Sequence, residues 1–317
     1  MRAGMSYGAG RGEAEAKRRA RIAISVVFLV NGFALASWIS RIPTITDELD
    51  LSNGQVGTAL ASLAAGAILA FPFAGRLIDR RSSQTTLLLS AAVLLAALPF
   101  VGLAPHLLLL MPALLIFGAG NGAMDVSMNA QGVEVERFFG ASIMSSLHGC
   151  FSVGAFLGAA VGAGAAYVDL PPFAHFLTVS VLGGVTLWYA RRWLIPDLPD
   201  ERAHKEAPTF ALPPRSLWLL GALALCTSIG EGAMADWSGL YLHDALDTSK
   251  GYAAFGYAVF SICMLIGRFS IWPSNGFVEA RPPHLKSKKP KLNSGRPTPT
   301  SRRFRANSRS ISTRFRR

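Results

Sequence analysis

Residues 121–131, NGAMDVSMNAQ, hold the polar groups best placed to do chemistry in this chain. Asn121, Asp125 and Asn129 recur every four residues, so a helix would place them on one face. They follow an apolar run, residues 107–120, that is typical of a membrane span. A carboxyl between two amides at that depth is costly unless a partner, water or a solute satisfies it. Asp125 is therefore the first candidate for reversible proton binding, and the two amides could hydrogen-bond a polyol.

A second interpretation of this stretch stays open. If the span ends near Gly120, then Asp125 lies in the headgroup region and is simply solvated. Glu231 lies well inside a later apolar run, where an ionisable side chain is a functional candidate by default. Glu231 is therefore the second candidate for coupling to protons or solute.

Four other side chains could contribute to a solute site. Asn31 and Trp38 lie in the first apolar run, and Trp237 lies in the seventh. The two tryptophans could stack on the face of a sugar, or they could belong to the aromatic belt at the membrane interface. His148 could relay protons because imidazole titrates near neutral pH, or it could be a packed polar residue.

Composition places the chain among membrane proteins. Of its 317 residues, 51% are hydrophobic and 16% are charged, against about 25% charged in ordinary soluble domains. The net charge of +12 is not spread evenly, because residues 273–317 carry 13 Lys and Arg and one acid. The preceding residues hold 18 basic and 18 acidic side chains. The body of the protein is therefore neutral, and only the tail is basic.

Eight apolar segments are long enough to span a bilayer as helices. They cover residues 22–42, 53–77, 85–104, 107–131, 142–167, 173–194, 216–242 and 251–272. The expected domains are an N-terminal segment (1–21), a six-helix bundle (22–194), a polar linker (195–215), a partial bundle of two helices (216–272) and a basic disordered tail (273–317). Gly154, Gly158 and Gly162 recur every four residues and predict close helix packing.

Loop charges predict the orientation of these spans. Lys and Arg cluster before the first span, after the second and after the sixth, whereas the opposite loops carry mainly acids. By the positive-inside rule the N-terminus and the linker lie in the cytoplasm. Arg41 is then expected at the outer headgroups. The predicted location is the inner (plasma) membrane, with multiple passes.

Two short matches indicate an internal repeat. Residues 33–38 (FALASW) match residues 232–237 (GAMADW), and Gly75-Arg76 matches Gly267-Arg268. The offsets, 199 and 192 residues, are similar. Parallel repeats are one known plan of transporters, which bind solute between the halves near the midplane. The other explanation is coincidence, since Ala and Gly are abundant here.

Residues 75–81, GRLIDRR, resemble the G-x-x-x-D-R motif between helices two and three of the major facilitator superfamily. Residues 121–132, 146–152 and 231–237 look like a bacterial branch distantly similar to fucose and glucose permeases. The resemblance covers residues 20–268. It implies a bundle of two six-helix halves, with Gly75, Asp79 and Arg80 in a cytoplasmic gate that acts on conformation rather than on chemistry.

The chain departs from that family pattern in two places. Ser82, Ser83 and Gln84 follow the motif where Gly and basic residues are usual. After Arg268 the acid expected near position 271 is absent, and no further apolar spans follow. The abrupt change to Pro, Ser, Arg and Lys indicates truncation by a frameshift after helix eight. The alternative is a native basic tail that lies on anionic lipid.

The sequence therefore predicts an all-α polytopic membrane protein, with a complete first half of a major-facilitator-type bundle and about two helices of the second. The predicted function is proton-coupled, alternating-access transport of a small polar solute, with a sugar as one candidate. The alternative is a transport-incompetent product of a frameshifted transporter gene. No phosphate loop, Ser-His-Asp order or metal-ligand cluster indicates an enzyme, and we expect no cofactor or metal. The expected partners are the solute, protons and membrane lipid, not nucleic acid, and no oligomeric state is indicated.

Overall fold

The computed structural model describes residues 3–197 and 214–270, and within them the chain is helical, with no strand. Eight of its segments are long and apolar enough to cross a membrane. The long helices are α1 (Ala3–Ile39), α3 (Asn53–Arg80), α4 (Ser83–Leu103), α5 (Leu107–Phe139), α6 (Met144–Tyr167), α7 (Pro172–Ala190), α8 (Trp218–Leu240) and α9 (Lys250–Ser270). The predicted fold class is confirmed: six spans are followed by two. Most of the expected linker, and the tail at 273–317, lie outside the described residues.

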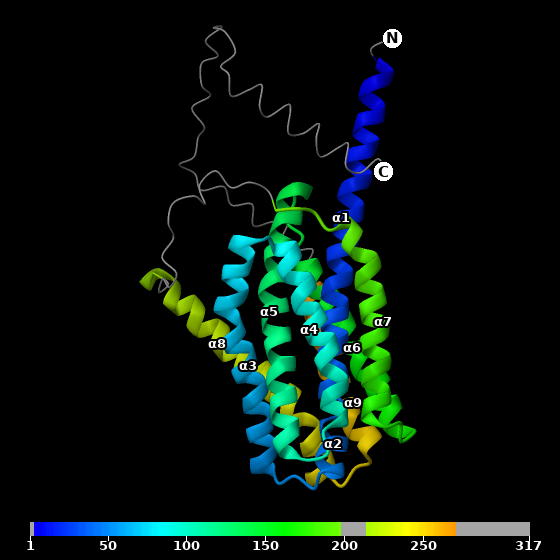
Figure 1. The fold of residues 1–317 in the computed structure, drawn as a ribbon, viewed down its shortest axis with the longest axis vertical. Helices are drawn as coiled ribbons and strands as arrows, with labels where there is room; N and C mark the ends of the chain where they lie inside the picture. The colour runs from blue at the N-terminus through cyan, green and yellow to red at the C-terminus, as the bar shows by residue number, and fades with distance from the viewer. Residues whose placement is uncertain (1–2, 198–213, 271–317) are drawn as a thin grey trace.

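Short elements connect the long helices. They are α2 (Ile42–Glu48), η1 (Arg191–Trp193), η2 (Arg215–Leu217) and η3 (Tyr241–Ala245). In Figure 1, α1 begins at the upper end of the bundle, and α2 lies at the lower end. We call the upper end, where α3 finishes at Arg80, the Arg80 end, and the lower end the Asp47 end.

Glycines bring two pairs of helices to backbone contact. A Cβ on Gly32 of α1 would meet the Phe151 carbonyl of α6, and a Cβ on Gly154 would meet the Leu29 carbonyl of α1. Gly66 of α3 and Gly118 of α5 form an equivalent crossing. Without a hydrophobic effect between lipid-facing helices, such close van der Waals contact is a main source of cohesion. The predicted packing role of the α6 glycines is thus confirmed.

Three turns at the Asp47 end share one conformation. Asp50, Asp169 and Asp247 have φ values of 49°, 51° and 52°, each just after a helix. Asp and Asn enter this left-handed region more readily than other non-glycine residues, because a short polar side chain can bond locally. Two of these turns have matching sequences, LDLS at 49–52 before α3 and LDTS at 246–249 before α9. This pair of turns, 197 residues apart, is a third match between the two copies of the predicted repeat.

The last two helices meet the six-helix bundle unequally. α9 packs along α6, and α8 comes close to the bundle only near the Asp47 end, where Gly239 lies against Pro43. Residues 214–230 are exposed along their whole length, and Figure 1 shows α8 leaning away from the bundle toward the Arg80 end. Of the second half, α8 therefore leaves the bundle toward the Arg80 end, whereas α9 stays packed on α6.

Candidate functional site

The polar stripe of α5 (Asn121, Asp125 and Asn129) lies between two packed faces of that helix. Neighbouring helices touch α5 at Gly118 and Gly122 (α3), Ser127 (α4) and Met128 (α1). At about 100° of rotation per residue, the stripe points between the directions of α1 and α3. The helix also continues without a break to Phe139, so the three residues do share a helical face, as predicted.

The acid of the stripe is hydrogen-bonded within its own helix. Asn129 Nδ2 donates to Asp125 Oδ1 over 3.2 Å and to the Asp125 carbonyl over 2.9 Å. Asp125 is exposed and Asn121 is half-buried. The Oδ1 atom of Asn121 is buried and has no hydrogen-bond partner among the described residues. The stripe thus presents an exposed Asp125 carboxyl, whereas the amide oxygen of Asn121 is enclosed by protein.

Asn31 links α1 to this region from inside the bundle. It is 1% exposed, and its Nδ2 donates to Met128 Sδ over 3.3 Å. Its Oδ1 is buried without a partner in the described part of the chain. One turn nearer the Arg80 end, Gly132 lies against Met144 and Leu147 of α6. Asn31 and the stripe are therefore near one another across the α1–α5 contact.

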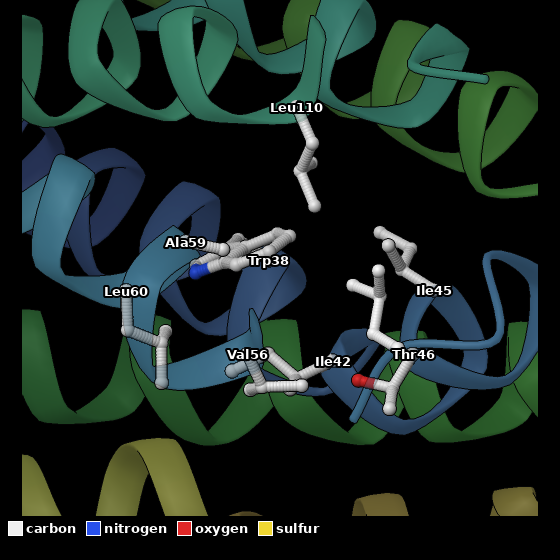
Figure 2. A pocket seen from close by; sticks show the side chains of 9 residues that line it. Trp38, Ile42, Ile45, Thr46, Val56, Ala59, Leu60 and Leu110 are labelled. Carbon is white, nitrogen blue, oxygen red and sulfur yellow. The ribbon is translucent and has the colours of Figure 1, made fainter. Parts of the chain in front are cut away.

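Trp38 lies elsewhere, in an apolar pocket at the Asp47 end. Figure 2 shows its indole between Ala59 and Leu60 of α3 on one side and Leu110 of α5 on the other. The side chain is only 3% exposed. Trp237, its partner in the predicted repeat, is 41% exposed on α8. The two tryptophans therefore have different surroundings: Trp38 is buried in a pocket and Trp237 is largely exposed.

Glu231 lies in a second pocket, between α6, α8 and α9. It is half-buried on α8 and lines a small cavity with Phe151 and Ser152 of α6 and Tyr257 and Ser261 of α9. Asp125, on α5, is not among the residues that line this cavity. The structure thus keeps the two candidate acids apart, one in each half of the chain.

His148 and the loop motif occupy still other positions. The His148 ring packs edge-on to Phe28 of α1, with ring centres 5.3 Å apart. Asp79 and Arg80 are exposed at the end of α3, and Gly75 is half-buried. Within residues 12–197 and 214–267, neither Asp79 nor Arg80 makes an ion pair. The gate assigned to them by resemblance remains a prediction.

Arg41 corrects one expectation from the loop charges. It is 1% exposed, so protein rather than headgroups surrounds it, and its Nη2 donates to the Leu170 carbonyl over 2.6 Å. The α2 helix and the turn after α6 cover it, because they fold back across the end of the bundle. The sequence places Arg41 at the end of the first span. It does not show that α2 and the turn after α6 enclose the side chain.

Sequence reasoning also missed a polar network at the Arg80 end. Asp197 accepts from the Ser83 backbone N–H over 2.6 Å and from its hydroxyl over 2.5 Å. Gln131, which is fully buried, donates to the Ile195 carbonyl over 2.9 Å. An acid at a helix N-terminus satisfies free N–H groups and complements the helix dipole. These bonds hold Ile195 and Asp197, which follow α7, against the start of α4 and the last part of α5.

A family model described as Major Facilitator Superfamily matches residues 17–278. The chain belongs to the major facilitator superfamily. This superfamily consists of transporters rather than enzymes, which confirms the predicted family and the absence of an enzyme assignment. Membership and the eight apolar helices together identify a multi-pass membrane protein.

Curated relatives within the superfamily are longer than this chain. An uncharacterized transporter, y4wD, of Sinorhizobium fredii is 38% identical over 77% of this chain and 65% of its own length. An MFS-type transporter of Yersinia pestis is 31% identical over 79% of the chain and 64% of its own length. Membrane protein MosC of Rhizobium meliloti is 32% identical over 78% and 60%. The chain thus spans 60–65% of the length of these relatives.

Solved structures agree on the fold. The nucleoside transporter NupG matches with a TM-score of 0.58 and 12% identity, covering 81% of this chain and 67% of NupG. Identity this low supports the shared helical architecture only. It does not show which solute this chain carries.

Proposed function

We propose that this chain works in proton-coupled, alternating-access transport of a small polar solute, with neutral sugars as the first class to test. Asp125 or Glu231 carries the proton. Asn121, Asn129 and Asn31 hydrogen-bond the solute, and Trp237 packs against it. The protein lies in the inner membrane with its N-terminus and its Arg80 end in the cytoplasm.

The stripe on α5 is the observation that carries this proposal. A carboxyl and two amides on one face of a spanning helix are expensive in hydrocarbon and useful in a solute pathway. The exposed Asp125 lies on the α5 face between α1 and α3, and the buried oxygen of Asn121 has no hydrogen-bond partner among the described residues. The lean of α8 away from the bundle toward the Arg80 end supports access to the bundle from the cytoplasm.

Transport in proteoliposomes tests the proposal. Purified chain is reconstituted with a pH-sensitive dye inside, and glucose, fucose or a nucleoside is added outside under an inward proton gradient. Asp125→Asn should abolish uphill uptake and leave solute exchange intact, because a neutral amide can hydrogen-bond but cannot carry a proton. Asp50→Asn is the matched control, since Asn tolerates the same left-handed turn. Unchanged accumulation in Asp125→Asn excludes Asp125, and Glu231→Gln then tests the second acid in the same assay.

A transport-incompetent product is the second candidate. It is favoured by residues 214–230, an apolar surface that no described helix covers. The coding DNA after codon 268 decides between the two. If neither alternative frame encodes further apolar spans, the frameshift explanation fails. If one frame does, the restored chain should accumulate solute and the present chain should not.

A further inference from the structure

The turn between α8 and α9 is held against α2 through one imidazole ring. The ring belongs to His243, which lies in η3 and is half-buried. Its Nδ1 lies 2.7 Å from the backbone carbonyl oxygen of Thr248, within the same turn. Its Nε2 lies 3.2 Å from Oδ2 of Asp47, on α2 of the six-helix half. One ring thus contacts both halves of the chain.

The turn itself fixes the first of these two acceptors. The backbone N–H of Thr248 donates to the Leu242 carbonyl over 3.3 Å, and the Thr248 hydroxyl donates to the same oxygen over 2.7 Å. Asp247, just before it, has a φ of 52°, in the left-handed region. The Thr248 carbonyl is therefore held beside the ring by its own turn. Only the contact with Asp47 depends on the turn being docked on α2.

Both acceptors can be satisfied only by the protonated ring. A carbonyl oxygen and an ionised carboxylate accept hydrogen bonds and donate none. The Lys250 ammonium, 2.9 Å from the same Asp47 oxygen, pairs with that carboxylate as an anion. A neutral imidazole has one N–H, whereas the imidazolium has two. Two acceptors on opposite ring nitrogens therefore specify the imidazolium form of His243.

Loss of one proton breaks the contact between the halves and spares the contact within the turn. The neutral ring keeps its one N–H on Nδ1, because the Thr248 carbonyl is closer and is held in place. The proton on Nε2 leaves to water, and its electron pair remains on the nitrogen. That lone pair then faces the Asp47 carboxylate, which repels it. Imidazole ordinarily titrates near about pH 6.5, so the change falls between mildly acidic and mildly basic pH.

The charged groups around the ring come from several elements. Asp47 lies on α2 and Lys250 at the start of α9, so the carboxylate has two cationic neighbours when His243 is protonated. Asp244 follows His243 in η3, and its negative charge favours the imidazolium. On α8 the nearest acid in sequence is Asp236, which is half-buried. Lys250 opposes a second positive charge beside it, whereas Asp47 and Asp244 together favour one.

We propose that His243 is a pH-sensitive clamp: its protonated ring docks the turn between α8 and α9 onto Asp47 of α2, and deprotonation releases it. The docked arrangement binds the proton more tightly than the released one. By linkage, docking is therefore strongest below the titration of the ring and weakens as the pH rises through it. Both side chains are partly exposed, so the ratio of docked to released turns changes by up to about five-fold. The clamp is separate from the proposed transport proton at Asp125 or Glu231.

Pulsed electron spin resonance on the full chain in lipid nanodiscs tests the clamp. One spin label is attached to Asn53→Cys at the start of α3 and the other to Leu246→Cys in the turn, both at exposed positions. The native cysteines are replaced. The population of the short distance should fall by up to about five-fold between about pH 5 and about pH 8. No solute or proton gradient is present, so the result is independent of the transport assay.

Three variants separate the clamp from a general effect of pH. His243→Gln cannot change its charge, so its distance distribution should be the same at both pH values. The amide of Asp47→Asn can present either its oxygen or its N–H to the ring, so this variant should also lose the response. His106→Gln is the matched control, because His106 is exposed at the same end of the bundle, and it should keep the wild-type response. An unchanged wild-type distribution, or a response that survives in His243→Gln or Asp47→Asn, overturns the clamp.

Discussion

The carboxylate of Asp47 lies 2.9 Å from the ammonium nitrogen of Lys250, joining α2 of the six-helix half to the start of α9. The same oxygen is 3.2 Å from Nε2 of His243. These groups are about one-third exposed, so each pair is worth at most about 1 kcal/mol. They nevertheless lie where the halves touch, and they bias that contact toward the closed arrangement at the Asp47 end.

Charge reversal at this pair should open the Asp47 end. Ser238→Cys, on α8 near the contact, reports opening through its rate of reaction with a membrane-impermeant maleimide in a background without Cys150, Cys226 and Cys263. Lys250→Glu should raise that rate up to about five-fold, which corresponds to the loss of about 1 kcal/mol. The double exchange with Asp47→Lys should restore the slow rate. A double variant that labels as fast as the single one would show that the pair does not hold the halves together.

Close packing of α1 on α6 predicts an asymmetric effect of two similar substitutions. Gly154→Ala should destabilise the bundle by about 1–3 kcal/mol, because the new Cβ would meet the Leu29 carbonyl. Gly164→Ala, ten residues further along α6, meets nothing within 4 Å and should be neutral or slightly stabilising. Thermal unfolding in detergent measures both. Similar melting temperatures for the two variants would contradict the close contact.

The two tryptophans of the predicted repeat should differ in their contribution to stability. Trp38→Ala should cost about 3–5 kcal/mol, because it leaves a hole in the packed pocket of Figure 2. Trp237→Ala should cost much less, since its side chain is 41% exposed. Denaturation in detergent compares the free energies of unfolding. If Trp237→Ala alone weakens solute uptake, stacking on the solute is supported for Trp237 and not for Trp38.

The buried Gln131 should hold the segment after α7 in place. Gln131→Leu leaves the Ile195 carbonyl and the Ser83 hydroxyl with one partner fewer, at a cost of roughly 1–3 kcal/mol. Hydrogen exchange of the amides at 83–86 and 194–197 should therefore become at least ten-fold faster. Gln84→Leu is the control, because its 3.4 Å bond to the Arg191 carbonyl is exposed. Equal exchange in both variants would argue against a fixed segment.

The sequence was sufficient for the features that depend on local spacing. The eight apolar runs are helices, and Asn129 bonds to Asp125 because residues four apart meet on a helix. Contacts between residues far apart in the chain could not be predicted from local spacing. Ser83 and Asp197 are 114 residues apart, and their contact depends on where α7 ends relative to α4. Likewise, burial of Arg41 depends on α2 and the turn after α6 folding over it.

The separation of α8 from the bundle has a mechanical consequence. This helix has 23 residues, so at 1.5 Å per residue it is about 35 Å long. Its backbone comes closest to the six-helix half at one end, where Gly239 lies against Pro43, so a change in its tilt would pivot about that end. A tilt of only about 10° at the pivot would move the far tip by roughly 6 Å, more than the 5.4 Å pitch of a helical turn. Small changes in the packing around Pro43 and Gly239 are therefore amplified into movements as large as a small solute.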